Sequence, residues 1–143
     1  MNRSLSRWLL ALTVPLALAS STARTARGDT PREVPKDFSA ELVCRAERTY
    51  VLCLVPVSPP LGWRLNFAEI NLLKEPSFLK SVATRATYKP ETQRKPNLKL
   101  GFVTKQAGTG EISVQARALL CSESNGWCDH LAKVITTSVT VPP

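Results

Sequence analysis

A succession of short β-type runs, separated by turn residues, limits the fold of this chain more than any other feature. The runs are apolar and rich in β-branched residues, and residues 111–118 alternate polar and apolar side chains as a half-buried strand does. No stretch predicts a helix, since Pro76 ends the apolar run 67–74. Roughly seven or eight short strands with regular turn signals predict an all-β protein, an antiparallel β-sandwich. The expected strands are 38–46, 49–57, 68–74, 78–87, 98–105, 111–121 and 131–141.

The first residues predict export through a cleaved signal peptide. Arg3 and Arg7 precede an apolar run over 8–18, and Ala17 and Ala19 are small residues at the positions that a signal peptidase recognises. The run is shorter than the roughly 20 apolar residues that span a bilayer. We therefore expect a signal peptide over 1–19 with cleavage after Ala19, and no membrane insertion once it is removed. Polar residues 20–36 then form a flexible leader, and residues 37–143 form the folded domain.

The charge of the chain argues against a nucleic-acid partner. Lys and Arg number 19 against 11 Asp and Glu, but Arg3, Arg7, Arg24 and Arg27 lie in or just after the signal, which leaves 15 against 11. The densest basic segment, 89–99, contains two prolines and is typical of a solvated loop rather than of a basic face interleaved with aromatics. The remaining excess favours solubility and weak attraction to anions.

Four cysteines lie beyond the signal, and an even number in an exported chain indicates disulfides. Their spacings, eight residues between Cys44 and Cys53 and six between Cys121 and Cys128, fit no zinc pattern, so no metal is expected. Four cysteines allow three connectivities. A hairpin turn centred between Arg48 and Thr49 would place Cys44 opposite Cys53, and Cys121 and Cys128 would close a short loop. We expect the pairs Cys44–Cys53 and Cys121–Cys128.

Three features in order resemble the N-terminal periplasmic domain of the DsbD-type thiol:disulfide interchange reductases. The first is a bend with two prolines and a Gly-Trp pair that leads into a strand. The second is a Gly-Thr-Gly turn before an alternating strand, and the third is a cysteine pair leading into a β-branched final strand. They comprise residues 59–66, 108–120 and 121–141, and the resemblance spans roughly residues 38–141.

The resemblance implies an immunoglobulin-like β-sandwich in the periplasm of a Gram-negative-type bacterium. The family carries a cysteine pair on a loop between its last strands, and here that pair is Cys121 and Cys128. The pair would exchange electrons with a thioredoxin-like periplasmic protein or a membrane electron donor, without a cofactor. Cys44–Cys53 would be a structural bridge.

The residues themselves leave two hypotheses open, an exchange domain and a non-catalytic binding or assembly domain with two structural disulfides. Glu123 and Asp129 disfavour a nearby thiolate, whereas His130, when protonated, favours one and is a candidate modulator. Trp127 on the cysteine loop is expected to be exposed and to offer a surface for a partner. Trp63 is expected to pack in the core. No arrangement of Ser, His and acidic residues supports a hydrolase.

Overall fold

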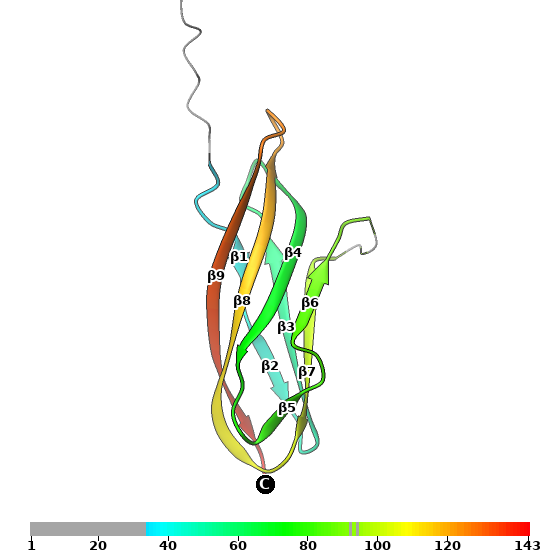
Figure 1. Cartoon of the computed structure of the whole chain (residues 1–143), viewed down its shortest axis with the longest axis vertical. Helices are drawn as coiled ribbons and strands as arrows, with labels where there is room; N and C mark the ends of the chain where they lie inside the picture. The colour runs from blue at the N-terminus through cyan, green and yellow to red at the C-terminus, as the bar shows by residue number, and fades with distance from the viewer. Residues whose placement is uncertain (1–33, 92, 94) are drawn as a thin grey trace, which may run out of the picture. The chain divides into compact units, whose positions relative to one another are not determined.

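The computed structural model describes residues 34–91, 93 and 95–143, and these form two antiparallel sheets without helices (Figure 1). The predicted signal peptide over 1–19, its cleavage after Ala19 and the leader up to residue 33 lie outside the described residues. The strands are β1 (Ser39–Ala40), β2 (Val43–Ala46), β3 (Tyr50–Ser58), β4 (Trp63–Lys74), β5 (Leu79–Ser81), β6 (Arg85–Tyr88), β7 (Asn97–Thr104), β8 (Gly108–Ser122) and β9 (Cys128–Val141).

The order of the strands is that of an immunoglobulin sandwich. One sheet has the order β1-β3-β7-β5, with β2 also paired to β3, and the other has the order β6-β4-β8-β9. The first order corresponds to strands A, B, E and D of the immunoglobulin fold, and β4, β8 and β9 correspond to strands C, F and G. The strand β6 is an addition beside β4. The expectation of an all-β, immunoglobulin-like antiparallel sandwich is therefore confirmed.

The core lies between the sheets and is built from alternate residues of the long strands. Along β3 and β8, one residue in two is buried and the next faces outward, because successive side chains of a strand point to opposite faces. Fully burying one such aliphatic side chain stabilises the fold by about 1.5–3 kcal/mol. The inward residues of these two strands are Val51, Cys53, Val55, Val57, Ile112, Val114, Ala116, Ala118 and Leu120.

Several strand boundaries differ from the expectation. The expected strand 78–87 is two strands, because the chain passes from β5, paired with β7, to β6, paired with β4. The strand β4 starts at Trp63 rather than at residue 68. Gly108 and Gly110 were expected in a turn and instead open β8, where the Phe78 ring covers them so closely that a Cβ on Gly108 would lie 2.7 Å from it.

The segment before β1 packs onto the sandwich. Pro35, which the sequence assigns to the leader, and Phe38 are both buried. The Lys133 ammonium of β9 lies 4.7 Å from the centroid of the Phe38 ring and 3.2 Å from Oδ1 of Asp37. A hydrogen bond from the backbone N–H of Phe38, together with Lys133, lowers the pKa of the Asp37 carboxyl. These contacts fix the entry of the chain beside β9.

Candidate functional site

Two disulfides tie neighbouring strands together, Cys44–Cys53 between β2 and β3 and Cys121–Cys128 between β8 and β9. This is the pairing that the sequence predicts. In both, the cysteines are direct partners in an antiparallel ladder, with Cα atoms 4.0 Å apart. The second pair differs from the expectation in one respect. Cys121 lies in the expected strand, but Cys128 opens β9 three residues before the expected start at 131, and only residues 123–127 form the loop.

The Cys44–Cys53 bridge faces the core. Cys53 is one of the inward residues of β3 and is 0% exposed, and Cys44 packs against the same hydrophobic cluster from β2. The core therefore covers the Cys53 side of this bridge, while Cys44 on β2 stays partly exposed.

The Cys121–Cys128 bridge lies on the outer face of its sheet. The inward residues of β8 are the even-numbered ones up to Leu120, so Cys121 points to the other side. Cys121 is only 1% exposed because its strand lies between β4 and β9. Cys128 is exposed, since β9 is the edge strand of the sheet. The two bridges thus share a ladder geometry but differ in access to solvent.

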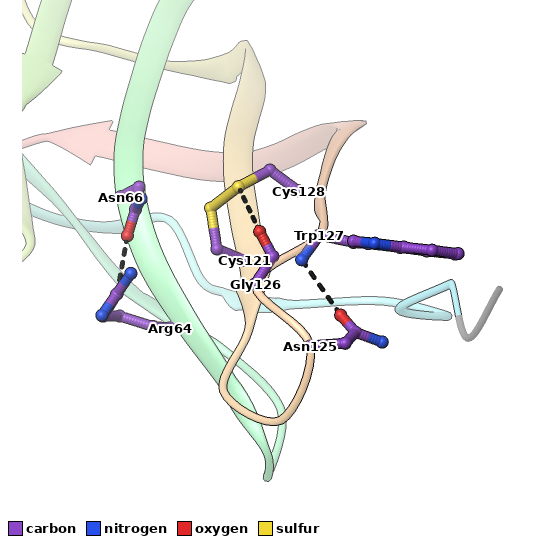
Figure 2. Close-up of a disulfide and its surroundings, with 7 residues drawn as sticks. All are labelled: Arg64, Asn66, Cys121, Asn125, Gly126, Trp127 and Cys128. Carbon is purple, nitrogen blue, oxygen red and sulfur yellow. Dashed lines mark hydrogen bonds between the residues drawn. A yellow bond between two sulfur atoms is a disulfide. The ribbon is translucent and has the colours of Figure 1, made fainter.

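The hairpin loop beyond the bridge is held by backbone hydrogen bonds. The N–H of Ser122 donates to the carbonyl of Trp127 at 2.7 Å, and the N–H of Gly126 donates to the carbonyl of Ser122 at 3.0 Å. Gly126 has a φ of 73°, a conformation that favours glycine. The Sγ of Cys128 lies 3.6 Å from the carbonyl oxygen of Gly126. Figure 2 shows that the Trp127 indole, on a residue 45% exposed, extends away from the sulfurs.

A cation lies on the other side of Cys121. Arg64 of β4 is the direct ladder partner of Cys121, so Arg64, Cys121 and Cys128 form one row across the outer face of three strands. The Nε of Arg64 donates to Oδ1 of Asn66 at 3.0 Å, and Figure 2 shows both side chains on the β4 side of Cys121. The sequence alone points to no role for Arg64, because only the register between β4 and β8 places it in the row of Cys121.

The other predicted residues take different places. His130 is exposed on the outer face of β9, two positions from Cys128, in the row of Leu119. Asp129 lies on the opposite face of the strand by alternation. Glu123 is in the loop, where its backbone N–H donates to the carbonyl of Gly62 at 3.0 Å.

The two tryptophans among the described residues, Trp63 and Trp127, lie where the sequence placed them. Trp63 is buried with 8% exposure at the start of β4, and Trp127 is exposed in the hairpin loop. The buried indole belongs to the core, so of the two only Trp127 is available to a partner.

A buried carboxylate lies farther along the same outer face. Glu69 is 6% exposed and accepts hydrogen bonds from Nδ2 of Asn71 at 2.5 Å and from the Arg85 guanidinium. The hydrogen bond from Asn71, that from Arg85 and the charges of Arg85 and Arg117 lower the pKa of Glu69. Its charge is thereby neutralised locally, and Arg117 contributes a second positive charge beside it.

Among the residues that the structure describes, no group of three His, Cys, Asp or Glu side chains could hold a metal ion. The same residues include no helix long and apolar enough to cross a membrane.

No protein-family model and no curated protein matches the chain. Among solved structures, the bacterial hydrophobin BslA is 12% identical, covers 77% of this chain and 97% of its own, and has a TM-score of 0.37. Murine CRIg is also 12% identical, covers 68% of this chain and 95% of its own, and has a TM-score of 0.35. These values carry no argument about function, and the resemblance to DsbD-type domains stays a prediction.

Proposed function

We propose that this protein is an extracytoplasmic thiol:disulfide exchange domain in which Cys121 and Cys128 are the redox pair and Cys44–Cys53 is a structural bridge. The observation that carries the proposal is the opposite placement of the two disulfides. One faces the core, with Cys53 at 0% exposure and Cys44 partly exposed, and the other lies on an outer face, with Cys121 at 1% exposure and Cys128 exposed. The predicted signal over 1–19 and the two disulfides support an oxidising compartment such as the periplasm.

Exchange proceeds by in-line attack of a thiolate on one sulfur of a disulfide. A bridge between directly opposed residues runs across the two strands, from Cys121 on β8 to Cys128 on β9. Among the residues that the structure describes, no strand pairs with β9 on its far side, so the side of Cys128 away from Cys121 lies at the edge of the sheet. A thioredoxin-like partner or a membrane electron donor would therefore attack the Sγ of Cys128 and form its mixed disulfide there.

Cys121 then leaves as a thiolate. Arg64, whose Nε donates to Asn66, is its ladder partner on β4, and a positive charge on the same face favours a thiolate. Asp129, which the sequence placed among the disfavouring neighbours, lies on the other face of β9. His130 lies on the same face and adds a further positive charge when protonated.

The proposal is tested by asking which cysteine a partner captures. The oxidised protein is mixed with a reduced thioredoxin whose resolving cysteine is replaced, and the trapped complex is digested and mapped by mass spectrometry. We expect a mixed disulfide at Cys128, with Cys44–Cys53 intact. A Cys121→Ser variant, with Cys128 pre-activated by an aromatic disulfide, should give the same adduct as a positive control.

The second candidate is a binding or assembly domain in which both disulfides are structural. It is favoured by the fact that Cys121–Cys128 closes the last row of the β8–β9 ladder, where a bridge also staples the hairpin. This candidate expects no mixed disulfide at Cys128 under conditions in which a known substrate of the thioredoxin is captured. That result would refute the exchange function.

A further inference from the structure

A hollow lined by one cation, Arg117, and by His130 lies on the outer face below the Cys121–Cys128 bridge. It has a volume of about 330 Å³ and is lined by Arg117, His130, Leu131 and Ala132. Arg117 of β8 is the ladder partner of Ala132, and His130 is in the row between that pair and the disulfide. Hollows of this size fall at the lower end of the range that small ligands occupy.

The charges around the hollow favour an anion. Arg64, Arg117 and His130 all lie on this face, in the rows that run from β4 to β9. Of the acidic side chains of β4 and β8 on this face, Glu69, the ladder partner of Arg117, is buried and already engaged by Arg85 and Asn71, and Glu111 pairs with Lys74 at 3.7 Å. Asp129 is on the opposite face of β9. A face whose acids are paired with cations and which carries further positive charge attracts negative groups and raises their local concentration.

The distance between the hollow and the exposed sulfur selects the length of the ligand. A strand rises about 3.3 Å per residue, so His130 lies roughly 7 Å from Cys128 and Ala132, in the row of Arg117, roughly 13 Å. A carboxylate held there can belong to the same small molecule as a thiol at Cys128 only if several bonds separate the two groups. A tripeptide thiol has this reach, whereas a mercapto acid of three carbons does not.

We propose that Cys128 also accepts a small anionic peptide thiol of the glutathione type, whose carboxylates are held by Arg117 and His130. The inference rests on the proposed exchange function and adds the class of substrate to it. The hollow positions the carboxylate end, and the thiol end then meets the exposed sulfur at the edge of the sheet.

The reaction balances with two peptide thiols as the reductant. The thiolate of the first attacks the Sγ of Cys128, the bond between the protein sulfurs breaks, and the electron pair leaves on the Sγ of Cys121 beside Arg64. A second peptide thiolate attacks the peptide sulfur of the mixed disulfide and releases Cys128. The protein disulfide gains two electrons, the two peptides leave as their disulfide, and their two protons pass to Cys121 and Cys128.

The test measures reduction rates of the oxidised full chain with four thiols, compared per thiolate. They are glutathione, 3-mercaptopropionate with the same sign of charge but a short reach, neutral 2-mercaptoethanol and cationic cysteamine. Quenching by alkylation and mass spectrometry assigns each rate to a cysteine pair. We expect glutathione to reduce Cys121–Cys128 about three- to tenfold faster than the other three, an advantage that falls as salt screens the charges.

Matched variants place the effect in the hollow. Arg117→Gln and His130→Gln should each lower the ratio of the glutathione rate to the 2-mercaptoethanol rate toward one. Arg45→Gln, which removes the same charge from an exposed position of β2 in the other sheet, should leave both rates unchanged. Thermal unfolding of each variant verifies that the domain is folded.

The outcomes separate this inference from the exchange function. If 2-mercaptoethanol reduces Cys121–Cys128 selectively but glutathione has no rate advantage, the anionic substrate class is wrong and the exchange function stands. The same conclusion follows if Arg45→Gln abolishes the glutathione advantage as fully as Arg117→Gln does. If no thiol reduces Cys121–Cys128 ahead of Cys44–Cys53, both are wrong.

Discussion

Removing the two disulfides separately should have unequal effects on stability. We compare a Cys44→Ala/Cys53→Ala variant with a Cys121→Ala/Cys128→Ala variant, each of which leaves the other bridge and no free thiol. The bridges join residues 9 and 7 positions apart, so loop-closure entropy in the unfolded chain contributes about 2.6 and about 2.4 kcal/mol to stability. On this term alone the two variants are nearly equal.

Burial makes the difference. The inner bridge also fills part of the core, where Cys53 is 0% exposed, and replacing its sulfurs leaves a cavity that costs about 1–2 kcal/mol more. The outer bridge leaves no cavity between the sheets. We therefore expect losses of about 4 kcal/mol for the Cys44/Cys53 variant and about 2.4 kcal/mol for the Cys121/Cys128 variant.

Urea unfolding monitored by fluorescence of the buried Trp63 measures both losses on one scale. The exposed Trp127 adds a signal that a Trp127→Phe background removes. An outer variant that loses as much stability as the inner one, or more, would refute the reasoning, because the outer bridge would then be part of the structural framework.

Two further predictions concern packing and pH. Gly108→Ala should destabilise the domain by about 1–3 kcal/mol in urea unfolding, because the new Cβ would lie 2.7 Å from the buried Phe78 ring, and a loss below about 0.5 kcal/mol would show that the ring moves freely. Glu69 has a lower pKa in the folded protein than in the unfolded chain, where it is near 4.5. Its ionised form therefore stabilises the fold fully above pH 4.5, and this contribution is lost as the pH falls through the folded pKa. Glu69→Gln should therefore make the free energy of unfolding depend less on pH below about 4.5, and an unchanged pH dependence would contradict the role of the Arg85 and Asn71 contacts.

The fold class was predictable from local patterns, and the pairing of cysteines was predictable in part from them. The alternation in residues 111–118 predicts a half-buried strand, and β8 contains it. The turn between Arg48 and Thr49 predicts a hairpin with Cys44 opposite Cys53, and the structure has this register. The crossing from β5 to β6 was not predictable, since residues 78–87 show the same β-type character on both sides of it.

The candidate site could be predicted from the sequence only in part. The sequence identified Cys121, Cys128 and His130, but the roles of Arg64 and Arg117 depend on the register of β8 against β4 and β9. Register between strands distant in sequence depends on how the core packs, and a shift by one residue would move each side chain to the other face. Which disulfide faces the core depends on the same register.

The reduction potentials of the two cysteine pairs test the central claim most directly. A bridge that stabilises the fold more is itself stabilised more by the fold, and a difference of about 1.4 kcal/mol corresponds to about 30 mV. Equilibration of the native protein in glutathione or dithiothreitol buffers, followed by alkylation and peptide mass spectrometry, gives both values. We expect the reduction potential of Cys121–Cys128 to lie above about −300 mV. The reduction potential of Cys44–Cys53 should be lower than that of Cys121–Cys128 by at least about 30 mV. Both pairs titrating together below about −300 mV would contradict the exchange function and leave a domain with two structural disulfides.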